Sequence, residues 1–169
     1  FVADISSRIS LYPELITPDN IDAHLAHLKN IEVIFSTWGM FTLTETQLDK
    51  LPNLKVIFYA AGATEYFSTP LLARGIKVVS AWQANAIPVA EFCLAQILLG
   101  CKGYFRNQRE YTGPEFFSAL ANNHTAPGNY QERVALIGAG AISQTLQRLL
   151  QPFYLEVLMI PSRPEKRVC

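Results

Sequence analysis

The chain alternates short apolar runs with amphipathic stretches, a pattern typical of strands separated by helices. Apolar runs at residues 32–36, 54–60 and 76–80 predict buried strands, and a second group is predicted at residues 133–137 and 155–160. Runs that are apolar at nearly every position suit parallel strands, because helices cover both faces of such sheets. The predicted fold class is therefore α/β with parallel sheets.

Capping signals predict where the first helices begin. A helix is expected at residues 17–29, with Thr17 or Asp19 as its N-cap. Thr44, followed three residues later by Gln47, has the pattern of a capping box and predicts a short helix that ends before the next proline.

Later helices are predicted from proline and glycine positions. A helix at residues 69–73 should stop at Gly75, and one at residues 88–110 should begin at Pro88, where a missing N–H does no harm. A further helix is expected at residues 141–151, between two of the predicted strands.

The chain ends and one internal stretch lack this regular pattern. Residues 1–4 are interpreted as the tail of a strand and residues 164–169 as an unpacked extension, so we expect the sequence to be a fragment. Residues 113–130 are rich in Gly and Pro and predict a boundary between two sheets, with one or two helical turns at residues 115–121.

Charge and cysteine content narrow the possible partners. Fourteen basic and fourteen acidic residues give a formal net charge of zero, so nothing predicts a nucleic acid partner. The apolar stretch at residues 86–101 contains Pro88 and Glu91 and is shorter than the roughly 20 residues of a membrane span, so no membrane association is expected. Cys93, Cys101 and Cys169 lack metal-ligand spacing. No metal site is predicted, and a cytoplasmic location fits best.

The most informative motif is a glycine-rich turn between a predicted strand and a predicted helix. Gly138 allows a sharp turn, and Gly140 removes a side chain where a pyrophosphate would approach the amides of Ala141 and Ile142. This is the start of a dinucleotide fingerprint, although Ser143 replaces its third glycine. A plain structural turn remains the alternative interpretation.

The end of the following strand bears on the choice of cofactor. An acidic residue would normally bond the ribose there, but Pro161 holds that place and cannot accept such a bond. Ser162 and Arg163 could instead hold the 2′-phosphate of NADP. The alternative is that Arg163 is a solvated surface residue, so both NAD and NADP stay open.

Three segments in this order resemble the D-isomer-specific 2-hydroxyacid dehydrogenase family: residues 59–64, residues 85–91 and residues 134–160 with the glycine turn. The resemblance implies a flavodoxin-like substrate domain plus the start of a Rossmann dinucleotide-binding domain. It also implies NAD or NADP as cofactor, a small 2-oxo or 2-hydroxy acid such as glyoxylate or hydroxypyruvate as substrate, and a homodimer formed partly by the long helix. The expected organisation is a substrate domain at 1–86, a crossover helix and interdomain loop at 87–130, and a truncated nucleotide-binding βαβ unit at 131–169.

The resemblance also suggests substrate-binding residues. In similar enzymes the loop that matches Ala61, Gly62 and Ala63 offers backbone N–H groups to the substrate carboxylate, as successive amides around a glycine can. Trp38 and Gly39 follow a strand and are candidate cleft residues. The alternatives are that Gly62 only ends a strand and that Trp38 is a buried core residue.

No catalytic residue is assigned to this chain. The family's catalytic Arg, acidic residue and His lie in a part that the chain does not include. His24 and His27 are expected to face solvent, and His124 lies in the predicted interdomain loop. We therefore expect an inactive fragment of an oxidoreductase. A non-catalytic NAD(H)-sensing module of the same fold is the alternative, and a structural α/β domain with a coincidental turn is a third hypothesis.

Overall fold

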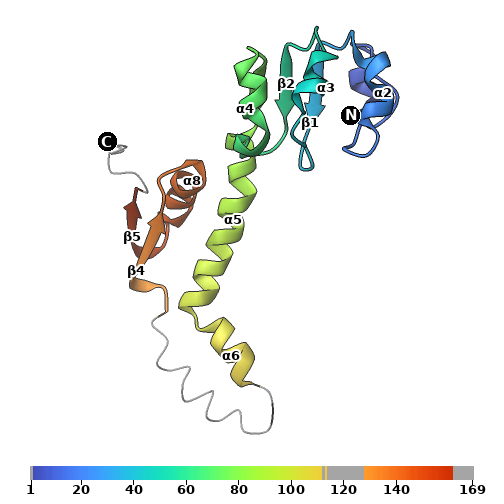
Figure 1. Cartoon of the computed structure of the whole chain (residues 1–169). Helices are drawn as coiled ribbons and strands as arrows, with labels where there is room; N and C mark the ends of the chain where they lie inside the picture. Colours follow the sequence, from blue (N-terminus) through green and yellow to red (C-terminus); the bar gives the residue numbers. More distant parts are fainter. Residues whose placement is uncertain (1, 112, 114–127, 162–169) are drawn as a thin grey trace. The chain divides into compact units, whose positions relative to one another are not determined.

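The computed structural model describes residues 2–111, 113 and 128–161. The chain divides into two compact units, Phe1–Ala81 and Trp82–Cys169. Each unit has a parallel sheet and at least one helix packed against it (Figure 1). The predicted α/β class with parallel sheets is confirmed.

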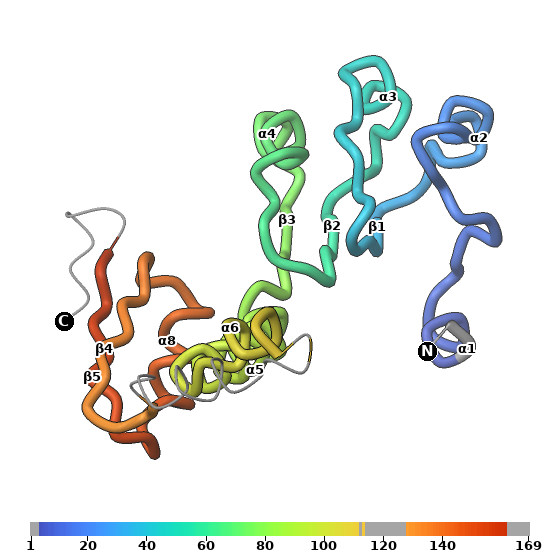
Figure 2. The backbone as a smooth tube through the Cα atoms, turned by 90° about the horizontal axis from the view of Figure 1, so that it is seen from below, coloured from blue at the N-terminus to red at the C-terminus, as the bar shows by residue number. Residues whose placement is uncertain are grey.

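The first unit is built on a three-stranded parallel sheet in the order β1-β2-β3. Its strands are β1 (Val33–Ser36), β2 (Val56–Tyr59) and β3 (Lys77–Ser80). Its helices are α1 (Val2–Ser6), α2 (Ile21–Leu28), α3 (Glu45–Asp49) and α4 (Glu65–Ala73). Figure 2 shows α2, α3 and α4 along the same side of this sheet. The carboxyl ends of the strands are in register, with Ser36 beside Tyr59 and Tyr59 beside Ser80.

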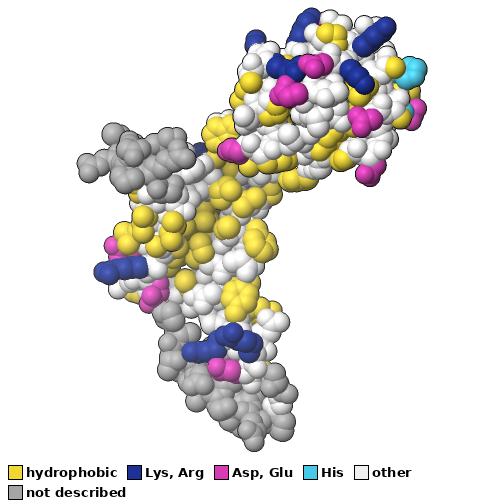
Figure 3. Space-filling model, in the orientation of Figure 1, with side chains coloured by type: hydrophobic (Ala, Val, Ile, Leu, Met, Phe, Trp, Pro, Cys, Tyr) yellow, Lys and Arg dark blue, Asp and Glu magenta, His cyan; other side chains and the backbone are white. Residues whose placement is uncertain are grey.

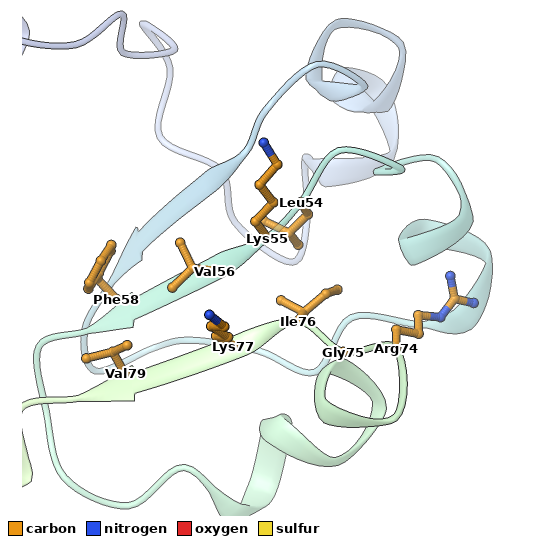
Figure 4. A pocket seen from close by; sticks show the side chains of 9 residues that line it. All are labelled: Leu54, Lys55, Val56, Phe58, Arg74, Gly75, Ile76, Lys77 and Val79. Atoms are coloured by element: carbon orange, nitrogen blue, oxygen red, sulfur yellow. The ribbon is translucent and has the colours of Figure 1, made fainter.

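The core of this unit lies between the sheet and those helices. Ile57 and Tyr59 of β2 pack with Phe67 and Leu71 of α4, and all four side chains are buried. The opposite face of the sheet is partly open. The pocket in Figure 4, a hollow of about 590 Å³, includes Phe58 and Val79 in its lining, and it contains none of the predicted site residues.

Local signals fix two helix boundaries in this unit as predicted. The capping box of α3 is present: the Gln47 amide donates to Thr44 Oγ1 over 3.2 Å, and the Thr44 amide donates to Gln47 Oε1 over 3.0 Å. Helix α4 ends at Ala73, and Gly75, two residues later, has a φ of 76°. The Ile76 amide then reaches back to the Leu71 carbonyl over 3.0 Å, which closes the helix in a Schellman motif.

The second unit contains α5 (Trp82–Cys101), α6 (Tyr104–Glu110), β4 (Tyr130–Ile137), α8 (Ala141–Leu150) and β5 (Tyr154–Ile160). Strands β4 and β5 are parallel and are joined through α8. One face of this βαβ unit packs against α5, whose Ala90 is buried with Leu136, Leu146 and Leu150. The other face leaves Ile137 exposed.

Several boundary predictions in the first unit are wrong. Helix α4 begins at Glu65 rather than at residue 69. Residues 2–6 form α1 rather than the tail of a strand. Helix α2 begins at Ile21, and neither Thr17 nor Asp19 is its N-cap: Asn20 is, and it makes no side-chain bond to the helix. The Asn20 carboxamide instead accepts a bond from the Thr17 amide over 2.8 Å, so local bonding moves the start of the helix past the predicted caps.

The long helix also differs from its prediction. It begins at Trp82, so Pro88 lies inside it, and it ends at Cys101 rather than at residue 110. Gly103 adopts a φ of 72° and separates α5 from α6. The helical turns predicted at residues 115–121 lie outside the described residues.

Helix α5 is longer than the apolar stretch at residues 86–101. With 20 residues and a mean hydropathy of 1.5, it meets the length and composition expected of a membrane span. This corrects the prediction that the stretch is too short. Length and composition are weak evidence by themselves, because helices packed in protein cores meet the same criteria, and α5 packs along α8 through Ala90.

Candidate functional site

The glycine turn joins β4 to α8 and has the geometry of a strand–turn–helix nucleotide motif. Gly138 has a φ of 99°, a conformation that residues with a side chain rarely adopt. Its amide donates to the Ile160 carbonyl over 2.7 Å, so the turn is fixed to the end of β5. Gly138 is therefore required by the backbone of the turn itself.

Gly140 is not required by the protein in this way. It is the N-cap of α8, with φ −80° and ψ −175°, values that any residue can adopt. A Cβ atom built on Gly140 would meet no atom within 4 Å. The space beside the start of α8 is thus open, and a side chain would project into it.

The amides at the start of α8 face that open space. Among the described residues, the amides of Ala141, Ile142 and Ser143 have no protein acceptor, and the N-cap contributes no side-chain bond. Free N–H groups and the positive end of the helix dipole favour an anion there. This geometry would accommodate the diphosphate of a dinucleotide, and the assignment of Gly138, Gly140, Ala141 and Ile142 to a cofactor stays a prediction.

The departures from the fingerprint lie at the edges of the turn. Ser143 is half-buried in the first turn of α8, where the third glycine of the motif would stand. Pro161 directly follows β5, next to the carbonyl that binds Gly138, so no acidic side chain stands at that strand end. Ser162 and Arg163 lie outside the described residues.

The predicted substrate loop, residues 61–63, connects β2 to α4. Ala61 is buried, Gly62 is half-buried and Ala63 is exposed. No acceptor among the described residues bonds to the amides of Gly62 and Ala63, and the Thr64 side chain does not cap α4. The loop therefore presents N–H groups without an acceptor among the described residues, just before the start of α4. Whether Gly62 binds a ligand or only ends a strand stays open as a prediction.

Two side chains that the sequence analysis did not identify hold this loop from the neighbouring strands. Ser80 Oγ at the end of β3 lies 2.8 Å from the Ala61 carbonyl oxygen and 2.6 Å from that of Gly62. Thr37 Oγ1, after β1, lies 3.5 Å from the Ala60 carbonyl oxygen. A polar residue at the carboxyl end of an otherwise apolar strand was the available signal.

Trp38 and Gly39 lie beyond the end of β1, at the same edge of the sheet. Trp38 is 75% exposed, so the alternative that it is a buried core residue is wrong. Gly39 has a φ of 101°, which a residue with a side chain would adopt only under strain. Trp38 is therefore free to contact a ligand at this edge.

Tyr66, three residues after the loop, is a titratable group with a shifted pKa. Tyr66 and Tyr59 share a hydrogen bond with 3.1 Å between their hydroxyl oxygens. This bond, together with burial, raises the pKa of Tyr66 to about 12, so the phenol keeps its proton at neutral pH.

The histidines are placed only partly as predicted. His27 is exposed as expected, but His24 does not simply face solvent. Its Nδ1 lies 2.7 Å from the Tyr12 hydroxyl, and its Nε2 lies 3.6 Å from Glu14. His124 lies outside the described residues. Within the described ranges, His, Cys, Asp and Glu side chains form no group of three or more that could hold a metal ion.

The sequence matches no protein-family model and no curated protein, whereas its fold matches solved structures. The D-mandelate dehydrogenase of Rhodotorula graminis has a TM-score of 0.74 at 18% identity, over 96% of this chain and 52% of that one. The NAD-dependent formate dehydrogenase of Staphylococcus aureus, solved with NAD, has a TM-score of 0.62 at 22% identity, over 91% of this chain and 47% of that one. The D-lactate dehydrogenase of Aquifex aeolicus, solved with NAD and lactic acid, has a TM-score of 0.55 at 22% identity, over 83% of this chain and 42% of that one.

The three matches cover between 83% and 96% of this chain. The chain spans about half the length of the solved structures that it matches. The resemblance seen in the sequence is thus confirmed for the fold: this chain has the fold of the D-2-hydroxyacid dehydrogenases, over about half of their length.

Proposed function

We propose that this chain is part of an NAD(P)-dependent oxidoreductase that transfers a hydride between NAD(P)H and a small 2-oxo or 2-hydroxy acid. The observation that carries the proposal is the glycine turn at residues 138–140, where an open space meets unpaired amides at a helix start. Similarity to dehydrogenases solved with NAD supports the same cofactor class.

In this proposal the amides of Ala141 and Ile142 bind the diphosphate, and Gly140 leaves room for its approach. The nicotinamide, when bound, supplies or accepts the hydride. Pro161 cannot bond a ribose hydroxyl as an acidic residue would, so we assign 2′-phosphate recognition to Ser162 and Arg163 if NADP is the cofactor. Both cofactors remain in the proposal.

The substrate end is proposed to be the 61–63 loop with Trp38 and Gly39. The amides of Gly62 and Ala63 would bind the carboxylate of the acid, because they lack protein acceptors among the described residues. The exposed indole of Trp38 would cover the substrate's apolar side. No residue of this chain is assigned as the proton donor, so we propose that the chain by itself is inactive.

A homodimer through α5 is also proposed. Phe92 is 66% exposed and Leu99 is 37% exposed, seven residues apart on the side of α5 away from Ala90. Figure 3 shows hydrophobic side chains gathered along α5. A second copy of this helix would cover them.

A cytoplasmic location is proposed as well. Cys93 and Cys101 are free thiols, in keeping with a reducing compartment such as the cytoplasm.

The proposal is tested by calorimetric titration of the chain with NADH and NADPH. We expect Gly140→Val to weaken binding at least tenfold, about 1.4 kcal/mol, because its side chain fills the space that the diphosphate needs. Ser143→Gly, which restores the third glycine of the fingerprint, is the matched control and should bind as well as the wild type or better. Equal affinities of wild type and Gly140→Val, or no binding by either, would refute the proposal.

A second candidate is a non-catalytic NAD(H)-sensing module. Ser143 and Pro161, which both depart from the usual cofactor site, favour it. The two candidates are distinguished by assaying the protein encoded by the full gene for NAD(P)H oxidation with glyoxylate, hydroxypyruvate or pyruvate. Turnover supports the enzyme, whereas NADH-dependent changes in oligomeric state without turnover support the sensor.

A further inference from the structure

Ser80 makes two contacts that nothing in its own strand requires. It is the last residue of β3 and is half-buried. Its Oγ lies 2.8 Å from the carbonyl oxygen of Ala61 and 2.6 Å from that of Gly62. Two successive carbonyl groups of the 61–63 loop therefore point toward one hydroxyl group.

This arrangement determines where the next two amides point. The peptide bonds of the loop are trans, and in a trans peptide the C=O of one residue and the N–H of the following residue point in opposite directions. The Ala61 carbonyl faces Ser80, so the Gly62 N–H points away from Ser80. The same holds for the Gly62 carbonyl and the Ala63 N–H. Both amides are thus turned to the side opposite β3.

The Ala61 side chain is buried in the core and anchors the start of the loop, but this contact does not orient the peptide groups that follow it. Gly62 does not have a positive φ, so the backbone freedom of glycine does not fix the turn. The Thr37 hydroxyl lies farther away, at 3.5 Å, and reaches the preceding carbonyl of Ala60. Ser80 is therefore the main side-chain restraint on the two peptides that present their amides.

We propose that Ser80 is a positioning residue that orients the Gly62 and Ala63 amides for a carboxylate. The inference rests on the proposed function, in which these amides bind the substrate's carboxylate. Ser80 itself does not touch the acid, because its hydroxyl lies on the carbonyl side of the loop. Without it the two peptides can rotate, and the amides then no longer converge on one anion.

The test is an NMR titration of the ¹⁵N-labelled 169-residue chain with pyruvate. In the wild type we expect pyruvate to shift the amide signals of Gly62 and Ala63. Ser80→Ala should weaken the apparent affinity about three- to tenfold, the effect of losing one hydrogen bond. Ser80→Thr keeps the hydroxyl and should restore wild-type affinity. Ser36→Ala, at the end of β1, is the matched control and should change nothing, because the Ser36 hydroxyl bonds the Thr37 carbonyl and no carbonyl of the 61–63 loop.

The outcomes separate this inference from the proposed function. If the wild type binds pyruvate at Gly62 and Ala63 and Ser80→Ala binds equally well, the role of Ser80 is refuted while the carboxylate site stands. If pyruvate shifts neither amide in the wild type, both are refuted. Should Ser80→Ala fail to fold, Ser80→Cys, whose thiol is a much weaker donor, replaces it with the same expected loss.

Discussion

The two candidate binding turns, at residues 138–140 and 61–63, are held in their conformations by different interactions. In each unit a parallel strand leads through a short turn to a helix whose first amides lack protein acceptors among the described residues. The 138–140 turn takes its shape from its own backbone, since Gly138 has a φ of 99°. The 61–63 loop has no such residue and is held by Ser80, from a neighbouring strand.

This difference explains why the residues that shape the first turn could be named from a local motif, whereas Ser80, which holds the 61–63 loop, could not. A turn fixed by glycine leaves its signature within a few consecutive residues, so a motif can identify it. A loop fixed by a side chain nearly 20 residues further along the chain leaves no local signature. The partner residue appears only once the sheet register is known, because β2 and β3 bring Tyr59 beside Ser80.

The largest expected effect is a loss of stability in one unit that leaves the binding turn of the other unit unchanged. Phe67 is fully buried, with its ring 5.1 Å from that of Tyr59, so Phe67→Ala should lower the free energy of unfolding of the first unit by about 3–5 kcal/mol. Hydrogen exchange resolved by residue measures this change, and NADH affinity should stay unchanged. Leu150→Ala in α8 is the matched control and should lower the free energy of unfolding of the second unit instead. A loss of protection in both units from either variant would contradict independent units.

A smaller effect is expected at the backbone-fixed turn. Gly138→Ala places a side chain on a residue with a φ of 99°, which should cost about 1–3 kcal/mol of the free energy of unfolding of the second unit. Chemical denaturation measures it. If Gly138→Ala is as stable as the wild type, the turn is not fixed by its glycine and the comparison between the two turns fails.

Helix α3 is a third case for comparison, because its N-terminus is capped by the side chains of Thr44 and Gln47. Thr44→Ala removes the hydroxyl that accepts the Gln47 amide and should cost about 1 kcal/mol. Thermal unfolding checks this value, and Thr44→Ser, which keeps the cap, should be nearly neutral. An unchanged melting temperature for Thr44→Ala would mean that such side-chain caps contribute little here.

The smallest stability effect is expected at Gly140, the partner of Gly138 in the motif. A Cβ there meets open space, so the entropy gained by replacing a glycine roughly offsets the poorer N-cap, and Gly140→Ala should stay within about 0.5 kcal/mol of the wild type. The variant should nevertheless bind NADH more weakly. A destabilisation as large as that of Gly138→Ala would show that Gly140 serves the fold rather than a ligand.

The same reasoning explains which parts of the fold the sequence predicted. The five apolar runs all became strands, because buried parallel strands need nearly continuous apolar sequence. The start of α5 was missed because proline is favoured in a first turn and Pro88 was taken to mark one, whereas the helix begins at Trp82 and contains Pro88 in its interior. Residues 2–6 were missed because five residues are too few for a helical period to show.

For the candidate sites, the sequence predicted positions along the chain but not the exposure of side chains. The sequence predicted the turn at Gly138 and Gly140 from their place between a strand and a helix. It placed Trp38 after a strand but left open whether its side chain is buried. Its exposure depends on which side chains fill the space above the sheet, which a single sequence does not encode locally.

The central claim, that the 138–140 turn presents free amides to a diphosphate, is tested most directly by following those amides in solution. In a ¹H–¹⁵N titration of the chain with NAD⁺, we predict that Ala141 and Ile142 show the largest shifts, since their N–H groups would donate to the phosphates. Shifts confined to the first unit, or saturating NAD⁺ that leaves both signals in place, would contradict the account.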